Sequence, residues 1–264
     1  MKPATTVPSA DAMQVMAPRT LANSHPNLLP LLRPGISVLD VGCGPGTLTA
    51  EIARRVHPGP VVGMDCNPEM ISVAEQQSRP GVLANLIFYA GDIRQSGWDG
   101  EFDVANAVRA LQWIRRPQIA LANMARAVRP GGTVVAVDYD HTRARWEGAP
   151  SGWTRFYSAY LDWRRGLGLD NAIARRLHRL FETAGLVNVR AIAHITAVRA
   201  CDPDFFRVAG VWRMIIESHG RHMVGSGLMT EIERREALDD FTEWMKDAQA
   251  AQTIGESCVI GRRP

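Results

Sequence analysis

Three glycines in a short turn are the first residues of this sequence that point to chemistry. The stretch VLDVGCGPGTLTAEIA, residues 38–53, places them at positions 42, 44 and 46, just after Asp40. An apolar run precedes the turn and an amphipathic run follows it, so we expect a strand that leads through the glycines into a helix. Such a turn lets the backbone approach a ligand closely and leaves the free N–H groups of the helix start facing that ligand.

The spacing of the glycines disfavours two common nucleotide ligands. In the dinucleotide fingerprint G-x-G-x-x-G the third glycine would be residue 47, but the chain has Thr47 there and its third glycine, Gly46, one position earlier. The turn also lacks the G-K-S/T ending of a triphosphate-binding loop. NAD, FAD and nucleoside triphosphates are therefore poor candidates for this turn.

Two acidic residues after the next two expected strands favour an adenosine ligand instead. Asp65 closes the run at 61–65, and a carboxylate at the carboxyl end of the second strand of a doubly wound sheet contacts ribose hydroxyls. Asp92 follows the run at 86–90, where its carboxylate can accept from an exocyclic amine while Ile93 and Met70 pack on a ring face. The sequence therefore predicts a cofactor that contains adenosine.

The elements that must position these residues alternate in the manner of an α/β fold. Short apolar runs alternate with longer amphipathic stretches, which is typical of helices around a parallel sheet. The expected strands are 36–41, 61–65, 86–90, 102–107 and 133–139, with late strands at 189–199 and 257–263, and the expected helices are 47–56, 68–78 and 117–128. We predict a doubly wound, mostly parallel, seven-stranded Rossmann-like sheet with a helical cap over the carboxyl ends of its strands.

The order of these motifs resembles a known enzyme family. D-V-G-C-G-P-G at the turn, the aspartate that closes 61–65, G-D-I after 86–90, F-D-V-A-N-A at 102–107 and R-P-G-G-T at 129–133 together resemble the class I S-adenosylmethionine-dependent methyltransferases. Within them the chain is most similar to the small-molecule branch typified by the ubiquinone and menaquinone biosynthesis methyltransferases. The resemblance is good over about residues 33–140 and holds only in outline elsewhere.

The resemblance implies S-adenosylmethionine as the cofactor and a role for each residue of its site. Asp65 would bind the ribose hydroxyls, Asp92 and Ile93 would meet the adenine, and Asp40 would orient the turn or the cofactor's amino group. Arg19 and Asn23 would close over the methionine end. The other implied cofactor residues are Gly42, Cys43, Gly44, Cys66, Met70, Asn106 and Ala107.

Methyl transfer from a sulfonium requires the acceptor atom to lie in line with the departing sulfur while water is excluded. Positioning of this kind supplies roughly 7–11 kcal/mol of the barrier, and a base is needed only for a weakly acidic hydroxyl or a carbon acceptor. The family often has a histidine where this chain has Gln112. The candidate bases are His25, in the N-terminal segment, and His141, which we favour because it follows the fifth expected strand.

Aromatic residues gather in the helical region after the fifth strand. Those between Trp146 and Trp163 recur at helical spacing, which is first of all the pattern of a helix's buried face. Because this region covers the strand ends in such folds, some of these side chains are also expected to line the acceptor pocket. Arg109, Tyr157 and Trp212 are the expected acceptor contacts, so we expect a small acceptor that is aromatic or largely apolar.

Composition limits the class of protein. The chain has 264 residues, 46% of them hydrophobic and 22% charged, and a formal charge of +3 without any basic run, so nucleic acid is not an expected partner. Four cysteines without CxxC or metal-ligand spacing indicate reduced thiols and no metal. We find no apolar leader and no stretch long enough to cross a bilayer, so we expect a cytoplasmic protein without membrane contact.

The expected organisation is a single domain with a lid. Residues 1–32 form an N-terminal arm and helical segment, 33–140 the cofactor-binding core, and 141–264 the cap helices with the late strands that complete the same sheet. An apolar cap could pair with a second copy, so a homodimer is a further expectation.

Several other function classes stay open. An amino-directed nucleic-acid methyltransferase would show an Asp/Asn-Pro-Pro-aromatic motif where this chain reads Asn106-Ala107-Val108-Arg109. A protein methyltransferase, or a non-catalytic module that only binds the cofactor, would keep the same fold. An NAD-dependent oxidoreductase is disfavoured by Gly46 and Thr47.

Overall fold

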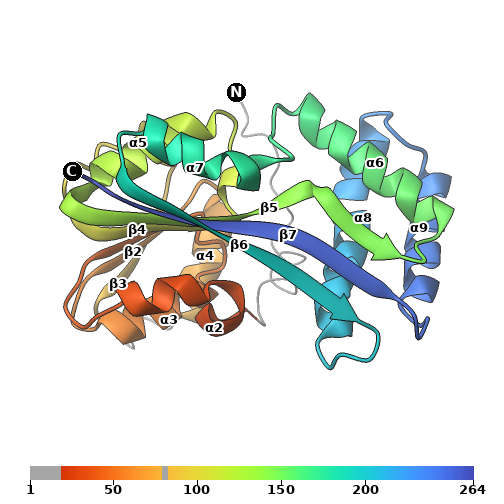
Figure 1. The fold of residues 1–264 in the computed structure, drawn as a ribbon, viewed down its shortest axis with the longest axis horizontal. Coiled ribbons are helices and arrows are strands. Elements are labelled where there is room, and N and C mark those ends of the chain that lie inside the picture. The colour runs from red at the N-terminus through yellow and green to blue at the C-terminus, as the bar shows by residue number, and fades with distance from the viewer. Residues whose placement is uncertain (1–18, 79–82) are drawn as a thin grey trace. The chain divides into compact units, whose positions relative to one another are not determined.

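The fold is built on one seven-stranded sheet, seen in a computed structural model that describes residues 19–78 and 83–264 (Figure 1). The strand order is β3-β2-β1-β4-β5-β7-β6, and β1 to β5 pair in parallel. This confirms the predicted mostly parallel, doubly wound sheet. The strands are β1 (Val38–Val41), β2 (Val61–Asp65), β3 (Leu86–Ala90), β4 (Phe102–Val108), β5 (Val128–Glu147), β6 (Val187–Arg199) and β7 (Ala251–Arg262).

The helices between the first five strands begin and end within one residue of their predicted bounds. Pro68 and Pro117 each open a helix, and Asn67 caps α4 by accepting from the Glu69 amide at 3.0 Å. The α-helices are α2 (Leu21–Ser24), α3 (Thr47–Val56), α4 (Pro68–Gln77), α5 (Pro117–Ala127), α6 (Ser151–Gly166), α7 (Ile173–Thr183), α8 (Phe205–Gly225) and α9 (Glu231–Trp244). Short 3-10 turns are η1 (Pro26–Leu31), η2 (Ile93–Gln95) and η3 (Leu111–Trp113).

The last strand in sequence lies inside the sheet, between β5 and β6. It runs antiparallel to β5, because the Gly131 amide donates to the Arg263 carbonyl and the Arg263 amide donates back to Gly132. Both β5 and β7 are longer than the apolar runs that predicted them. Polar side chains continue these strands where they pair, for example Trp146 Nε1, which donates to Gln252 Oε1 at 3.0 Å.

Contacts within the chain divide it into two compact units. Of the described residues, the first unit contains 19–138, 173–193 and 257–264, and the second contains 139–172 and 194–256. Helix α7, which the sequence pattern grouped with the cap helices, belongs to the first unit and packs against α5. Its apolar face, which includes Leu177 and Phe181, explains this placement because both side chains are fully buried in the core of that unit.

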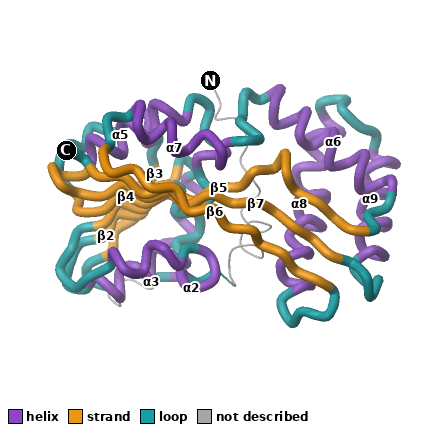
Figure 2. The backbone as a smooth tube through the Cα atoms, in the orientation of Figure 1, coloured by secondary structure: helices purple, strands orange, loops and turns teal. Residues whose placement is uncertain are grey.

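The first unit has a hydrophobic core on each face of its sheet. Figure 2 shows α5 and α7 over one face and α2 and α3 over the other. Alternation along β1 sends Leu39 into the core beneath α5 and Val38 into the core that contains Ile52 of α3. Asp40 follows the same alternation as Val38, so its carboxylate points toward α3.

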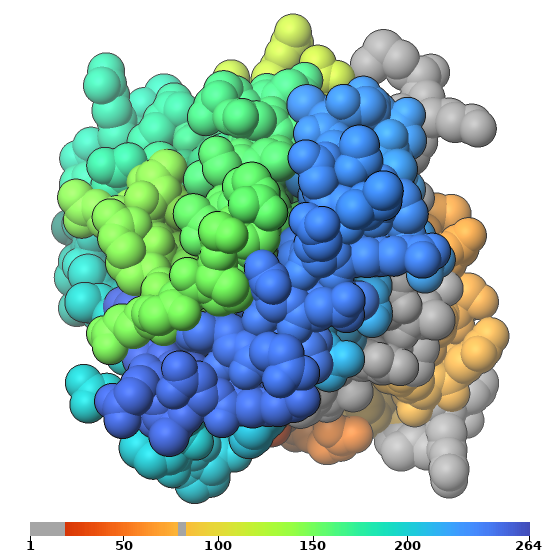
Figure 3. All heavy atoms as spheres, turned by 90° about the vertical axis from the view of Figure 1, so that its right-hand side faces the viewer, coloured from red at the N-terminus to blue at the C-terminus, as the bar shows by residue number. Residues whose placement is uncertain are grey.

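The second unit has a core of aromatic side chains. Helix α6 packs against α8 and α9, and Figure 3 shows α6 and α9 side by side on its surface. The aromatic stripe of α6 forms the buried face of that helix, which was the first interpretation of its spacing. The rings that contact one another within this unit include Trp146, Trp153, Phe156, Tyr157, Tyr160, Trp163, Trp212 and Phe241.

Candidate functional site

The glycine turn between β1 and α3 is held tightly against its neighbours. The amides of Gly42 and Cys43 both donate to the Met64 carbonyl at the end of β2. Gly42 has a φ of +72°, and a Cβ placed on it would overlap the Cβ of Ala110. Gly46 has a φ of +77°, and a Cβ there would lie 2.6 Å from the ring of Phe88. Chain packing and the positive φ values therefore require glycine at both positions.

Asp40 lies at the bottom of the turn and is 3% exposed. Its two oxygens accept from Thr49 Oγ1 at 2.7 Å and from Asn106 Nδ2 at 2.8 Å. The register of the sheet explains the second contact, because Asp40 and Asn106 are direct partners in the β1–β4 ladder. Burial raises the pKa of the Asp40 carboxyl to about 6, against the opposing effect of these two hydrogen bonds. A carboxyl of this kind carries a negative charge at neutral pH and gains stability when a cation approaches.

Asp65 connects the end of β2 to the glycine turn. Its Oδ2 accepts from the Gly44 amide at 3.0 Å and its Oδ1 accepts from the Asn67 amide at 2.9 Å. Burial raises the pKa of this carboxyl above its ordinary value. Since each carboxylate oxygen can accept more than one hydrogen bond, Asp65 can still receive the hydroxyl groups of a ribose.

A pocket opens over the turn and the first turn of α3. An acidic side chain, Asp40, and a basic one, Arg19, both contribute to its wall. Gly46, the N-cap residue of α3, supplies no side-chain hydrogen bond to the first helical turn, and Thr47 and Leu48 of that turn line the pocket. The N-terminal amides of α3 therefore lie beside the pocket. The lining residues are Arg19, Asp40, Gly42, Cys43, Pro45, Thr47, Leu48 and Val108.

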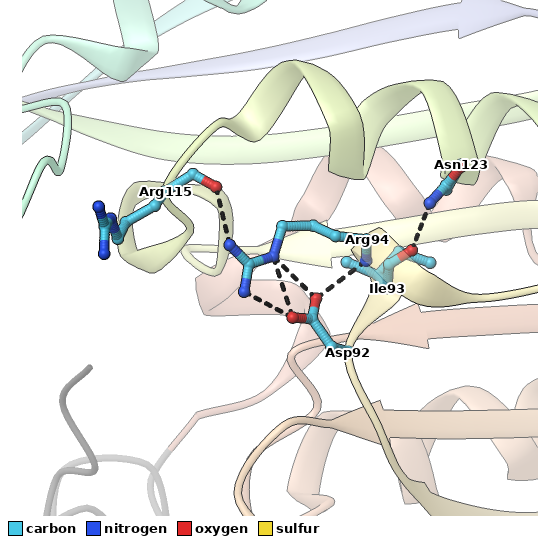
Figure 4. Close-up of polar contacts among 5 residues, drawn as sticks. All are labelled: Asp92, Ile93, Arg94, Arg115 and Asn123. Carbon is cyan, nitrogen blue, oxygen red and sulfur yellow. Dashed lines mark hydrogen bonds and ion pairs between the residues drawn. The ribbon is translucent and has the colours of Figure 1, made fainter. Parts of the chain in front are cut away.

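Asp92 carries a partner that the sequence pattern did not suggest. The Arg94 guanidinium donates hydrogen bonds to both of its oxygens, as Figure 4 shows. These contacts hold the pKa of the Asp92 carboxyl below its ordinary value. Ile93 is 3% exposed and belongs to the hydrophobic core, while its carbonyl accepts from Asn123 Nδ2 at 2.8 Å. The side chain of Ile93 is therefore not available to pack on a ring face, and its carbonyl also accepts from the Ser96 amide at 3.3 Å.

The other predicted cofactor residues differ in exposure. Cys66 is exposed beside Asp65, whereas Met70 and Ala107 are buried in α4 and β4. Burial raises the pKa of the Cys43 thiol well above its ordinary value, so Cys43 acts as a small packed residue and not as a nucleophile. Asn23 caps α2, where its side chain accepts from the Thr20 amide.

His141 lies in the core of the second unit and is 4% exposed. Its amide donates to the Asn171 carbonyl at 2.9 Å, and its Nδ1 lies 3.3 Å from the hydroxyl of Tyr157. The same hydroxyl donates to the His141 carbonyl at 2.8 Å. Burial, and then the Arg164 charge, hold the pKa of the imidazole well below its ordinary value, so the ring is neutral at pH 7.

The predicted acceptor contacts belong to different units. Tyr157 and Trp212 pack against each other in the second unit, with ring centroids 5.3 Å apart, and both are buried. Arg109 belongs to the first unit, where it follows β4 with a φ of +53° and its amide donates to the Val137 carbonyl at 2.7 Å. Gln112 braces this turn by donating to the Arg109 carbonyl.

Comparison with known protein families shows which family this chain belongs to. A family model described as a methyltransferase domain matches residues 32–184, which include the glycine turn, Asp65 and Asp92. The chain belongs to the methyltransferase domain family. This confirms the resemblance to S-adenosylmethionine-dependent methyltransferases seen in the sequence, and with it S-adenosylmethionine as the cofactor.

Relatives of the methyltransferase domain act on varied acceptors. A trans-aconitate 2-methyltransferase of Deinococcus radiodurans is 34% identical over 139 residues, which are 48% of this chain and 52% of that protein. A ubiquinone/menaquinone biosynthesis C-methyltransferase of Idiomarina loihiensis is 33% identical over 111 residues, which are 41% of this chain and 44% of that protein. The chain thus spans about half the length of the curated relatives it matches.

A solved structure shares the fold of the methyltransferase domain. Phosphoethanolamine N-methyltransferase 2 of Haemonchus contortus, in complex with phosphomonomethylethanolamine and S-adenosylhomocysteine, superposes with a TM-score of 0.60. The alignment covers 92% of this chain and 52% of that chain at 16% identity, so it supports the fold alone.

Two residues of the site escaped sequence reasoning. Thr49 belongs to an ordinary helix pattern, and only its place one turn after the glycines hinted that its hydroxyl could reach Asp40. Arg94 follows Asp92 by two residues, but no pattern says that such an arginine will fold back onto the carboxylate. Both contacts depend on side-chain directions that composition and periodicity do not encode.

Within the described ranges 19–78 and 83–264, no group of three or more His, Cys, Asp or Glu side chains is arranged to hold a metal ion. Among the helices in these ranges, none has both the length and the apolar character needed to span a bilayer.

Proposed function

We propose that this chain transfers a methyl group from S-adenosylmethionine to a small acceptor that is aromatic or largely apolar. The observation that carries the proposal is the pocket over the glycine turn, in which Asp40 and Arg19 contribute opposite charges to one wall. The α-amino acid end of S-adenosylmethionine carries an ammonium and a carboxylate. The pocket is therefore complementary in charge to the part of the cofactor that distinguishes it from other adenosine compounds.

Each charge of that amino acid end has a partner of opposite sign. The ammonium is placed at Asp40, whose buried carboxylate is already oriented by Thr49 and Asn106. The carboxylate is placed at Arg19 and the N-terminal amides of α3, where the helix dipole favours a negative charge. Gly42 and Cys43 line the same pocket.

Arg19→Ala tests this assignment. We expect the affinity for S-adenosylhomocysteine to fall roughly 10-fold or more, because a hydrogen bond to a charged group contributes about 1.5–3 kcal/mol. The affinity for 5′-methylthioadenosine, which lacks the amino acid end, should change less than about twofold. Calorimetric titration with both ligands measures the difference.

Arg54→Ala is the matched control, because Arg54 is exposed near the end of α3 and does not line the pocket. It should leave both affinities unchanged. Equal losses for both ligands in Arg19→Ala would place the arginine elsewhere and contradict the charge assignment.

The adenosine end is assigned to residues after β2 and β3. Asp65 is the proposed ribose acceptor, since it closes β2 and already fixes the turn through Gly44. Asp92 and the backbone of Ile93 are proposed for the adenine. Cys66, Met70, Asn106 and Ala107 complete the proposed surroundings.

The chemistry that this site supplies is mainly positional. The cofactor, when bound, provides an activated methyl group, and the protein holds the acceptor in line with it while water is excluded. A base is required only if the acceptor is a weak acid. His141 stays the proposed base for that case, because its neutral imidazole can accept a proton, but its burial means that the acceptor would have to enter the aromatic core.

The acceptor class is tested by methyl transfer from radiolabelled S-adenosylmethionine. Phenols, quinols and aromatic amines are the compounds expected to take up label, with Arg109, Tyr157 and Trp212 as proposed contacts. trans-Aconitate belongs in the same panel because two relatives carry it in their names. Label that appears only in DNA, RNA or protein would replace the proposal with one of the macromolecular methyltransferase classes.

The non-catalytic alternative predicts cofactor binding without label in any acceptor.

The reducing cytoplasm is the proposed compartment of the protein, since all four cysteines are free thiols. The homodimer suggested by the sequence stays a prediction, to be tested by the mass of the protein in solution.

A further inference from the structure

Arg94 binds the carboxylate of Asp92, the residue proposed to meet the adenine, through both its guanidinium and its amide. We call this set of contacts the clasp. The guanidinium Nε lies 3.0 Å from both carboxylate oxygens and Nη2 lies 2.5 Å from Oδ2. The Arg94 amide also donates to Oδ1 at 2.9 Å. Figure 4 shows the guanidinium folded back over the carboxylate. Two charged groups this close form one of the stronger kinds of hydrogen bond.

The clasp limits how Asp92 can bind anything else. An ionised carboxylate offers about four acceptor positions. Three N–H groups occupy these positions: Nη2 on Oδ2, the Arg94 amide on Oδ1, and Nε, which is shared between both oxygens, so one position stays open. The Asp92 side chain is 23% exposed, which leaves it accessible to a ligand. A single N–H donor is the group that this geometry accepts.

The clasp is itself fixed at two further points. Nη1 of Arg94 donates to the Arg115 carbonyl at 3.2 Å, in the loop between β4 and α5. Arg116, the next residue, has a φ of +60°, a conformation that a side chain disfavours and that neighbouring contacts must maintain. On the other side, Asn123 of α5 holds the Ile93 carbonyl. Arg94 therefore cannot rotate freely about Asp92.

We propose that Arg94 is a positioning residue for recognition of the cofactor's base: it holds the Asp92 carboxylate turned so that its open acceptor position receives the 6-amino group of adenine. This rests on the proposed function, in which Asp92 meets the adenine. A base with a carbonyl at position 6 presents an acceptor at the same place and is repelled by the carboxylate. Arg94 thus sets the preference for adenine without touching the ligand.

The test compares S-adenosylhomocysteine with S-inosylhomocysteine, which has a carbonyl at position 6 and a proton on N1 but is otherwise the same. The wild-type chain should prefer the adenine ligand about 10-fold or more, since a buried polar group left unpaired costs about 1–3 kcal/mol. Asp92→Asn should lose most of this preference. Arg94→Ala should lower it at least about threefold, and Arg94→Lys, which keeps the charge but not the fork, should give an intermediate value.

Arg126→Ala is the matched control. Arg126 also holds this segment, by donating to the Ser96 and Trp98 carbonyls, but it does not touch Asp92. It should keep the wild-type preference, and thermal unfolding of all variants checks that they are folded. Because both ligands share the amino acid end and the ribose, general loosening of the site lowers both affinities and leaves their ratio unchanged.

The outcomes separate this inference from the proposed function. If Asp92→Asn loses the preference while Arg94→Ala and Arg94→Lys keep it, Asp92 recognises adenine without help and the role of Arg94 is wrong. If the wild-type chain shows no preference, or Asp92→Asn retains it, the adenine assignment itself fails. Should Arg94→Ala not fold, Arg94→Lys decides, because an unchanged ratio in that variant contradicts the need for the fork.

Discussion

Replacing Gly42 with alanine is expected to lower the affinity for S-adenosylhomocysteine at least about 100-fold, which corresponds to roughly 2.7 kcal/mol. The new Cβ would overlap Ala110 and would also sit on a backbone with a φ of +72°. Relieving the overlap requires the backbone of the turn or of Ala110 to move, and we expect this movement to change the pocket that Gly42 lines. Calorimetric titration measures the affinity, and circular dichroism establishes that the variant is folded.

Gly131→Ala separates the two causes of this effect. Gly131 has a similar φ of +78°, but a Cβ there would have no neighbour within 4 Å. This variant should lose about 1–2 kcal/mol of folding stability from the strained backbone and keep its cofactor affinity. An unchanged affinity in Gly42→Ala would show that the turn does not approach the cofactor.

Replacing Asp40 with asparagine is expected to weaken cofactor binding and to stabilise the free protein. Removing one partner of a buried charge pair costs about 2–5 kcal/mol, so the affinity for S-adenosylhomocysteine should fall at least about 30-fold. In the free protein the same carboxylate is unfavourable, because burial raises its pKa from 3.8 to about 6. Removing the charge should therefore raise the free energy of unfolding by up to about 3 kcal/mol at pH 7.5.

The raised pKa of Asp40 also predicts how the stability difference between Asp40→Asn and the wild type changes with pH. The folded protein holds the Asp40 proton more tightly than the unfolded chain, so this residue lowers stability as pH rises from about 4 to about 6. Asp40→Asn should thus gain stability over the wild type at pH 7.5 and gain little at pH 4. Thermal unfolding at both values measures the difference, and an equal change in stability at both pH values would contradict the raised pKa of Asp40.

Thr49→Val is the companion to this variant. Its hydroxyl donates to Asp40 and favours the ionised form, so its loss should raise the pKa of the carboxyl further. In the wild type, cofactor affinity should rise with pH as Asp40 ionises. In Thr49→Val the same rise in affinity should occur at a higher pH.

The positions of the residues proposed to bind the cofactor could be predicted because these residues lie at strand ends. Apolar runs gave β2 and β3 their bounds, and residues that follow parallel strands gather at one edge of the sheet. Asp40 and Asn106 meet for a related reason, since the register of β1 and β4 makes them neighbours. In each case the backbone alone brings the side chains together.

The remaining features depend on packing that sequence patterns do not encode. His141, Tyr157 and Trp212 read as pocket residues from their position after the fifth strand, yet they are buried against one another. Ile93 reads as a residue for a ring face and lies in the core. The insertion of β7 between β5 and β6 was likewise hidden, because an apolar run does not tell which neighbour a strand will choose.

The most direct test of this account is calorimetric titration of the purified chain with S-adenosylmethionine, S-adenosylhomocysteine and NADH, repeated with Asp65→Ala. We predict micromolar binding of the first two ligands, no binding of NADH, and a loss of several-fold or more in the variant, because Asp65 fixes Gly44 and is proposed to bind the ribose. Failure to bind either adenosyl ligand, or binding of NADH in their place, would contradict the assignment of the glycine turn.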